Sequence, residues 1–283
     1  MSSYKPLSQE TVREITTEYF AERKDKGHAQ VEPVLVLVGG QPGAGKTAAG
    51  HMARAELARR GGYVHVDADR MRRKIDTGGT RPSSEETQAD AGRLSTELRR
   101  IAVLEKRNII EEGTLRNAEV AGAFLDAMKK EGYKAELLAV ATPREESLVG
   151  IYQRYEKQHA QGTENPRFVT ERYHDEAMQG FEKTLAQNES KLDRVRVIDR
   201  NGQVLYDSAD TGKRHASALQ ALQEGQKLTD RKLYDIDQSW SFIKEAAARR
   251  SADRDYLATI EGHQERIADM QNPQRLGEIK NPQ

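Results

Sequence analysis

The sequence predicts an α/β fold: a mainly parallel sheet with helices on both faces, an antiparallel edge hairpin and a C-terminal helical extension. The stretch 34–38, Val-Leu-Val-Leu-Val, is continuously apolar and rich in β-branched residues, as expected of a strand buried on both faces. A glycine-rich turn and a segment of good helix formers follow it directly. Further apolar runs at 63–67, 108–112, 135–141 and 194–199 alternate with helical stretches, which indicates parallel strands joined by helices.

Local signals predict two elements at the margins of this sheet. Asn201-Gly202 lies between two short strand runs, and this dipeptide favours the tight turn of an antiparallel hairpin. A helix opened by Ser8 is expected over residues 8–25. Its apolar residues are Val12, Ile15 and Phe20.

The chain beyond residue 212 is expected to be helical. One apolar seam runs through it with spacings of 3, 4 and 3 and ends before Arg250, at Leu233, Ile236, Trp240 and Ile243. So short a seam predicts a helical hairpin, or a helix docked on the sheet domain, in preference to a long coiled coil. The last dozen residues are expected to be frayed. These patterns divide the chain into an N-terminal helix over 1–28, a sheet domain over 29–212 and a helical extension over 213–283.

Composition limits the classes of function. The chain has 283 residues, 45 Lys plus Arg balanced by 45 Asp plus Glu, and no Cys, so disulfides and thiolate chemistry are absent. The balanced charge does not suggest nucleic acid or membrane as a partner. Because no apolar run approaches the roughly 18 residues of a membrane span and residues 1–10 lack the apolar core of a signal peptide, a cytoplasmic protein is expected.

The glycine-rich turn has the spacing of a phosphate-binding loop, with Gly40 followed after four residues by Gly45-Lys46-Thr47. Backbone N–H groups and the helix N-terminus would hold phosphate oxygens, Lys46 would contact the β- and γ-phosphates, and Thr47 would bind Mg²⁺. The loop therefore predicts ATP, in preference to GTP, together with Mg²⁺. The expected nucleotide-binding residues are Gly40, Gln41, Pro42, Gly43, Ala44, Gly45, Lys46, Thr47 and Ala48.

Two carboxylates, Asp67 and Asp69, follow the second predicted strand at the edge where ligands bind in open α/β folds. Either can accept a proton from an attacking hydroxyl, or hold Mg²⁺ directly or through water. The alternative for either residue is a cap on the following helix.

The third predicted strand ends in Glu111-Glu112-Gly113-Thr114, with Arg116 nearby. Consecutive strand residues face opposite sides, so only one glutamate can face the cleft, and Thr114 and Arg116 supply polar contacts. An ordinary strand-to-helix loop is the alternative.

Arg154 and Arg167 follow in a helical region. Arginines that close over a nucleotide stabilise the charge that phosphoryl transfer concentrates on the equatorial oxygens. Solvated helix surface is the alternative for both.

Five segments, in order along the chain, resemble the zeta-toxin family of toxin–antitoxin systems: "GGQPGAGKT", "VHVDADRMR", "EEGTLRNAEV", "YQRYEKQHAQGTENPR" and "DRNGQVLYDS". The resemblance covers nearly the whole sheet domain. It implies a P-loop kinase-like fold. It also implies a toxin kinase that transfers the γ-phosphoryl group of ATP to the 3′-hydroxyl of UDP-N-acetylglucosamine, or a related UDP-amino sugar, and so blocks cell-wall synthesis.

Carried over by motif, the resemblance makes Asp69 the general base and gives Asp67 a supporting or magnesium role. Lys46 and Thr47 then contact phosphates and magnesium. Arg154 and Arg167 face the transferred phosphate, and the presence of His174 after them supports this alignment with the family motif. The implied contacts to the UDP-sugar are Glu112, Thr114, Arg116 and, on a less complete match, Glu97.

The sequence departs from the family pattern in two places. Phe124 stands where a small or hydroxylated residue is common, and residues 76–90 match poorly. The resemblance also implies a blocking partner: a separate antitoxin, or an inhibitory helix within 1–28 or 213–283. The alternative is that these helices cover the edges of the sheet. Two other functions stay open, namely a P-loop kinase of another small hydroxyl acceptor, such as a nucleotide or antibiotic, and a non-catalytic nucleotide-gated binding module.

Overall fold

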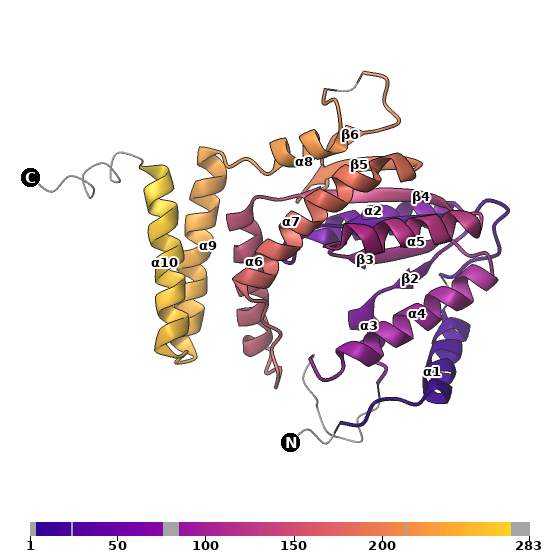
Figure 1. Ribbon diagram of the computed structural model, residues 1–283. Coiled ribbons are helices and arrows are strands. Elements are labelled where there is room, and N and C mark those ends of the chain that lie inside the picture. Colours follow the sequence, from indigo (N-terminus) through magenta and orange to yellow (C-terminus); the bar gives the residue numbers. More distant parts are fainter. Residues whose placement is uncertain (1–3, 24, 76–84, 213, 273–283) are drawn as a thin grey trace, which may run out of the picture.

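The computed structural model describes residues 4–23, 25–75, 85–212 and 214–272. At its centre lies a six-stranded sheet in the order β2-β3-β1-β4-β5-β6 (Figure 1). The first five strands are parallel where they pair, and β6 runs antiparallel to β5. Their bounds are β1 Val34–Gly39, β2 Val64–Val66, β3 Ile109–Gly113, β4 Lys134–Ala141, β5 Arg194–Asp199 and β6 Val204–Asp207. The predicted fold class is confirmed, including the edge hairpin at Asn201-Gly202.

Helices cover both faces of the sheet. The alternate side chains of β1 enter two separate cores, because successive strand residues point to opposite faces. Val34, Val36 and Val38 pack with α2 (Lys46–Arg59). Leu35 and Leu37 pack in the core of the other face. Six helices contribute to that core: α1 (Gln9–Glu22), α3 (Ala68–Arg72), α4 (Gln88–Leu104), α5 (Ala118–Lys130), α7 (Glu171–Asn188) and α8 (Ala218–Gly225).

The register of the parallel strands brings their carboxyl ends together. Gly39 of β1 lies opposite Gly113 of β3 and Ala139 of β4. The segments that leave these strands therefore start at one edge of the sheet. The short helix α3 (Ala68–Arg72) begins directly after β2 at the same edge.

The N-terminal helix α1 spans Gln9–Glu22 and packs on α4. Ser8 caps it as predicted, with its hydroxyl accepting a hydrogen bond from the Thr11 backbone N–H at 3.0 Å. The helix ends at Glu22, three residues before the predicted end, because the next residue, Arg23, is extended with a ψ of 119°.

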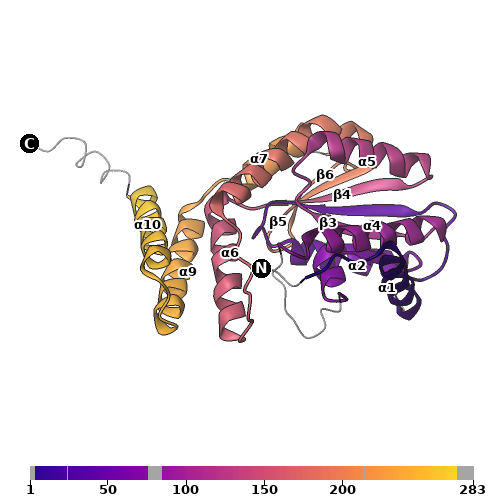
Figure 2. The same cartoon turned by 60° about the horizontal axis from the view of Figure 1, so that its bottom comes forward.

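The predicted helical hairpin is confirmed. It consists of α9 (Asp230–Arg249) and α10 (Arg254–Gln271), and α9 buries the predicted seam of Leu233, Ile236, Trp240 and Ile243. The hairpin packs against α6 (Arg144–Ala160), so these three helices stand side by side at one end of the molecule (Figures 1 and 2). α8 lies against β4, β5 and β6. The last dozen residues fall outside the described residues except for Asn272.

Over the part of the chain that the structure describes, no helix combines the length and the apolar composition needed to cross a membrane. A 3₁₀ turn at Glu189–Lys191 completes the set of helical elements in those ranges.

A matched pair of substitutions tests the packing of α7 on the sheet. Phe181 is 0% exposed, whereas Phe242 on the hairpin is 61% exposed. We expect Phe181→Ala to lower the free energy of unfolding by about 3–5 kcal/mol and Phe242→Ala by less than about 0.5 kcal/mol. Chemical denaturation measures both. Equal losses would contradict the assigned core.

Candidate active site

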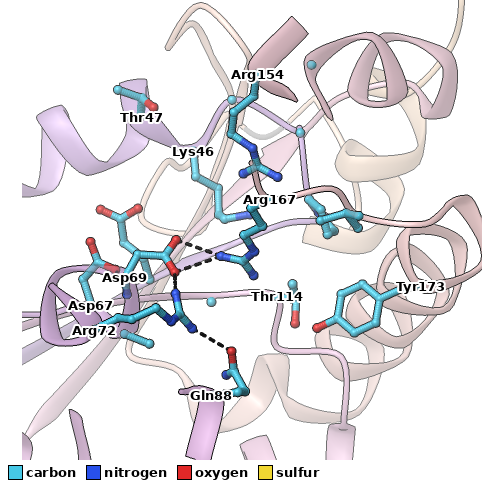
Figure 3. A pocket seen from close by; sticks show the side chains of 18 of the residues that line it. Lys46, Thr47, Asp67, Asp69, Arg72, Gln88, Thr114, Arg154, Arg167 and Tyr173 are labelled. Carbon is cyan, nitrogen blue, oxygen red and sulfur yellow. Dashed lines mark hydrogen bonds and ion pairs between the residues drawn. The ribbon is translucent and has the colours of Figure 1, made fainter. Parts of the chain in front are cut away.

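A cavity of about 560 Å³ opens at the carboxyl edge of the sheet (Figure 3). Its walls come from the phosphate loop, the start of α3, the end of β3, α6, the segment before α7 and the β5–β6 turn. These are the segments that the sequence motifs occupy, and the fold brings them to one place. Five predicted nucleotide-binding residues line the cavity, whereas Gly40, Gln41, Ala44 and Ala48 do not; those that do are Pro42, Gly43, Gly45, Lys46 and Thr47.

The phosphate loop needs glycine where it turns towards α6. Gly43 has a φ of +77°, and a Cβ there would lie 1.9 Å from the carbonyl oxygen of Ser147. Gln41 holds the loop from behind, because its Nε2 donates to the Thr142 carbonyl at 2.8 Å and to Ser147 Oγ at 3.2 Å. The loop is thus anchored to the end of β4 and to the first turn of α6.

Lys46 and Thr47 begin α2 and line the cavity. Nζ of Lys46 donates to the carbonyl oxygens of Gly40 at 2.8 Å and Gln41 at 3.0 Å. Burial lowers the pKa of Lys46 to about 8; Glu112 opposes this shift, and the nearby arginines add to it. Thr47 is exposed in the first turn of α2.

The two aspartates after β2 have different surroundings. Asp67 caps α3, with Oδ1 accepting from the Asp69 backbone N–H at 2.9 Å, so the capping alternative is confirmed for this residue. Asp69 points into the cavity and pairs with Nη1 of Arg167 at 2.8 and 2.9 Å, and with Arg72 (Figure 3). Burial acts to raise the pKa of Asp69, but the two guanidinium groups outweigh it and hold that pKa below its usual value. Asp69 is therefore ionised at neutral pH.

The two glutamates of β3 face opposite sides, as predicted. Glu112 lines the cavity, with Oε1 2.9 Å from Nε2 of the buried His65. Burial raises its pKa, but hydrogen bonding to His65 and nearby positive charges lower it overall. Glu111 instead pairs with Arg99 at 2.9 Å, and burial raises the pKa of Glu111.

Arg154 and Arg167 line the cavity and are not solvated helix surface. Arg154 comes from α6, and its Nε and Nη2 are buried without a hydrogen-bond partner among the described residues. Burial, with the charge of Arg167 second, lowers the pKa of Arg154. The backbone N–H of Arg167 donates to Oε1 of Gln158 at 2.6 Å, so α6 also fixes the segment that carries Arg167.

The expected sugar-binding residues are only partly brought together. Thr114 lines the cavity. Arg116 is exposed and does not line it, but its guanidinium lies 4.7 Å from the centre of the Tyr173 ring, which does. Glu97 lies elsewhere, in a groove between α1 and α4, where it pairs with Arg100 at 2.7 Å. Its position on α4 turns it towards α1, away from the carboxyl edge of the sheet.

Four of the cavity residues that were not predicted carry polar side chains: Arg72, Gln88, Tyr173 and Arg200. Nη2 of Arg72 donates to Oε1 of Gln88 at 2.7 Å, which joins α3 to the start of α4. Arg72 lies three residues after Asp69 in a helix, a spacing that could have indicated the pair. Arg200 follows β5 at the carboxyl edge, which is also a usable signal. Gln88 and Tyr173 carry no comparable sequence signal.

His174 supports the site from behind. Its Nε2 lies 2.7 Å from Ser147 Oγ, which in turn accepts from Gln41, and its Nδ1 lies 2.9 Å from Asp175 Oδ1. Burial lowers the pKa of His174, so a neutral ring links α7 to the phosphate loop. Phe124 is one of the two departures from the family pattern noted in the sequence. Its ring lies 4.7 Å from the guanidinium of Arg99, and it does not line the cavity.

The donors present suit Mg²⁺ held jointly with phosphates. In the described ranges no group of three or more His, Asp or Glu residues could hold a metal ion by itself. Thr47, Asp67 and Glu112 do line the cavity beside the loop. This set fits Mg²⁺, which commonly binds through one or two protein oxygens together with substrate phosphates and water.

A phosphate loop at the head of α2, basic residues facing it and a carboxylate at the start of α3 are the features of a P-loop phosphotransferase of the kinase type. The family model of zeta toxins matches residues 17–211. The chain belongs to the zeta toxin family.

Relatives within the family are similar over much of their length. Toxin PezT of Streptococcus pneumoniae is 28% identical over 207 residues, which cover 69% of this chain and 79% of the relative. Toxin zeta of Enterococcus hirae is 26% identical over 203 residues, 66% of this chain and 68% of the relative.

Solved structures share the fold. One from the PezAT chromosomal toxin-antitoxin system of Streptococcus pneumoniae matches with a TM-score of 0.71 and 22% identity, covering 85% of this chain and 99% of that one. A complex of AvrRxo1-ORF1 and -ORF2 with ATP matches with a TM-score of 0.57 and 14% identity, covering 90% and 86%. At these identities the likeness is one of fold.

Two glycine substitutions distinguish the cost of a left-handed backbone from the cost of a clash between the phosphate loop and α6. Gly43 and Gly132 both have left-handed φ values, +77° and +82°, but a Cβ at Gly132 meets nothing within 4 Å. We expect Gly132→Ala to cost about 1–2 kcal/mol in stability and leave the loop intact. Gly43→Ala should cost more and abolish binding of a fluorescent ATP analogue. Wild-type affinity in Gly43→Ala would contradict the loop geometry.

Proposed function

We propose that this protein is a toxin kinase that transfers the γ-phosphoryl group of ATP to the 3′-hydroxyl of UDP-N-acetylglucosamine or a related UDP-amino sugar, and so blocks cell-wall synthesis. The observation that carries the kinase assignment is the convergence of Lys46, Arg154, Arg167 and Asp69 on one cavity. The sugar nucleotide as acceptor is supported by the family to which the chain belongs.

The donor half of the proposed site is the phosphate loop with its cations. Loop N–H groups and Lys46 bind the β- and γ-phosphates, and the guanidinium of Arg154 offers N–H groups that no described residue uses. Arg154 and Arg167 neutralise the charge that develops on the transferred phosphoryl group. Mg²⁺, bound at Thr47 with Asp67 or Glu112 nearby, supplies further charge neutralisation and orients the phosphates.

The acceptor half lies beyond Asp69. The Asp69 carboxylate is ionised and faces the cavity, so it is placed to accept the proton of the attacking hydroxyl. Thr114, Gln88 and Tyr173 line the same side and provide hydrogen-bonding groups and an aromatic ring. A sugar nucleotide needs polar contacts of this kind along both its sugar and its base.

An antitoxin partner is part of the proposal. The support is the family and the PezAT toxin-antitoxin system in which a structural relative occurs. The intramolecular alternative receives no support from the cavity walls, because within the described ranges no lining residue comes from α1, α8, α9 or α10.

A second candidate is a kinase of another small hydroxyl acceptor. The position of Glu97 favours it, because the expected sugar-binding glutamate lies in the α1–α4 groove, outside the cavity. Gln88 and Tyr173 line the acceptor side, and Arg116 lies over the tyrosine ring. The acceptor side of the cavity thus contains side chains, Gln88 and Tyr173, that the family motifs in the sequence did not indicate.

The direct experiment is incubation with ATP, Mg²⁺ and UDP-N-acetylglucosamine, with mass spectrometry of the products. We expect one added phosphate on the sugar nucleotide. Asp69→Ala should reduce turnover by at least about 100-fold, since it removes the proton acceptor, with the fold retained. A panel with nucleotides and antibiotics as acceptors identifies the second candidate.

Two results would argue against this proposal. Near-normal turnover by Asp69→Ala on the true substrate would refute the base assignment. Nucleotide binding without transfer to any acceptor would favour the non-catalytic binding module. Glu97→Ala serves as the control in the same assay, and its turnover shows whether that residue takes part despite its distance from the cavity.

A pH dependence follows from Lys46. Its pKa is lowered to about 8, so the free enzyme loses this positive charge as the pH rises through that value. Because kcat/KM reports the free enzyme, kcat/KM for ATP should fall about tenfold per pH unit above pH 8. Arginine side chains keep their charge throughout that range.

Lys46→Arg is the matched control for this prediction. The guanidinium does not titrate below roughly pH 12, so the variant should be less active than the wild type but free of the alkaline decline. A wild-type profile as flat as that of the arginine variant would contradict the assignment of the alkaline limb to Lys46.

A further inference from the structure

The α9–α10 hairpin lies outside the residues matched by the family model, yet it packs on α6, the helix that carries Arg154. We propose that this hairpin is a working part of the catalytic site, and that Arg250 is a positioning residue that acts through Glu156 to hold Arg154 over the phosphate loop. The inference rests on the proposed kinase function.

The first observation is the ion pair between the hairpin and α6. Glu156, only 6% exposed, accepts two hydrogen bonds from Arg250, to Nε at 2.8 Å and to Nη2 at 2.9 Å. Arg250 is the C-cap residue that directly follows α9. Glu156 lies two residues after Arg154, in the same turn of α6. The planar, bidentate geometry fixes that turn in position and direction.

Aromatic rings pack around this ion pair and connect it to the segment that carries Arg167. The Arg250 guanidinium lies 5.5 Å from the ring centre of Tyr155 and 5.1 Å from that of Tyr256 on α10. Phe168, the residue after Arg167, packs edge-on against Tyr152 at 5.1 Å and Tyr155 at 5.0 Å. The segment that carries Arg167 is therefore held against the same surface of α6.

A third attachment joins α10 to the start of α7. Nε2 of His263 lies 3.0 Å from Oε1 of Glu171, and the His263 ring stacks on Trp240 at 4.4 Å with 6° between the planes. Glu171 also accepts a hydrogen bond from Arg144, at the first residue of α6, at 3.2 Å. The hairpin thus contacts the chain segment that contains Arg154 and Arg167 at two places, Glu156 and Glu171.

Electrostatics explain why such a support is needed. Arg154, Arg167 and Lys46 face one cavity, where each positive charge disfavours the others. Buried guanidinium N–H groups of Arg154 have no hydrogen-bond partner among the described residues, so its own contacts do not hold it there. Removing Arg250 would leave the buried Glu156 carboxylate unpaired, and the α6 turn would then shift to expose that charge to water.

The test is a double-mutant cycle in single-turnover phosphoryl transfer, at a temperature where every variant is folded. Arg250→Met keeps the aliphatic stem but removes the ion pair, and we expect it to lower the rate by about 10- to 100-fold. In an Arg154→Met background, Arg250→Met should lower the rate by about twofold or less, because the arginine that Arg250 positions is already absent. A purely structural role would give the same factor in both backgrounds and would overturn the inference.

Arg249→Met is the matched control. The Arg249 side chain is 70% exposed, and among the described residues its one ion pair is with Glu245, one turn back on the surface of α9. The Arg249→Met variant should therefore transfer phosphate at the wild-type rate. If Arg250→Met does not fold, Arg250→Lys replaces it: it keeps the charge but loses the bidentate contact, and a smaller loss with the same non-additivity is expected. An Arg250→Lys rate equal to the wild type would overturn the inference.

The two hypotheses fail separately. A wild-type protein that transfers phosphate while Arg250→Met keeps the full rate refutes the positioning role alone. A wild-type protein that binds ATP but transfers phosphate to no acceptor refutes the proposed kinase function, and the positioning role with it.

Discussion

The close approach of the phosphate loop to the first turns of α6 is the contact on which the rest of the site depends. Gly43 lies so near the Ser147 carbonyl that no side chain fits between them, and Gln41 hydrogen-bonds to the same serine. Arg154 follows Ser147 by seven residues, which is close to two helical turns and places both on one face of α6. The contact that shapes the loop therefore also sets the arginine above it. A shift of α6 would alter phosphate binding and charge neutralisation together.

The charges in the cavity are arranged for a polyanion. Lys46, whose pKa burial lowers, donates to the loop carbonyls, and Arg154 keeps buried N–H groups that no described residue uses. Asp69 pairs with Arg167 and with Arg72. A phosphate chain would satisfy all three cations at once. The packing of α6 and of the segment that follows it offsets the repulsion between these positive charges.

How far the sequence could predict this site depends on the kind of element that carries each residue. Residues at the ends of strands, such as Asp69 and Glu112, were placed correctly because parallel strands present their carboxyl ends at one edge and alternate their side chains. Glu97 was expected in the site and lies in the α1–α4 groove, because the rotation of a helix about its own axis depends on packing that a motif does not contain. Gln88 and Tyr173 reach the cavity only through tertiary structure. The hairpin at 230–271 was predicted from its apolar seam, but its contact with Glu156 joins residues 94 positions apart and leaves no local signal.

The pairing of Asp69 with Arg167 bears on how the proposed reaction would begin. A carboxylate held between two guanidinium groups has a lowered pKa and is a poor proton acceptor. Phosphoryl transfer has a loose transition state in which the attacking hydroxyl keeps its proton until late, so position matters more than basicity. If a γ-phosphate drew Arg167 away, Asp69 would lose one of its two positive partners and its pKa would rise towards the usual value. Nucleotide binding would then free the base at the moment when the acceptor hydroxyl needs it. The same ion pair holds Arg167 at the cavity.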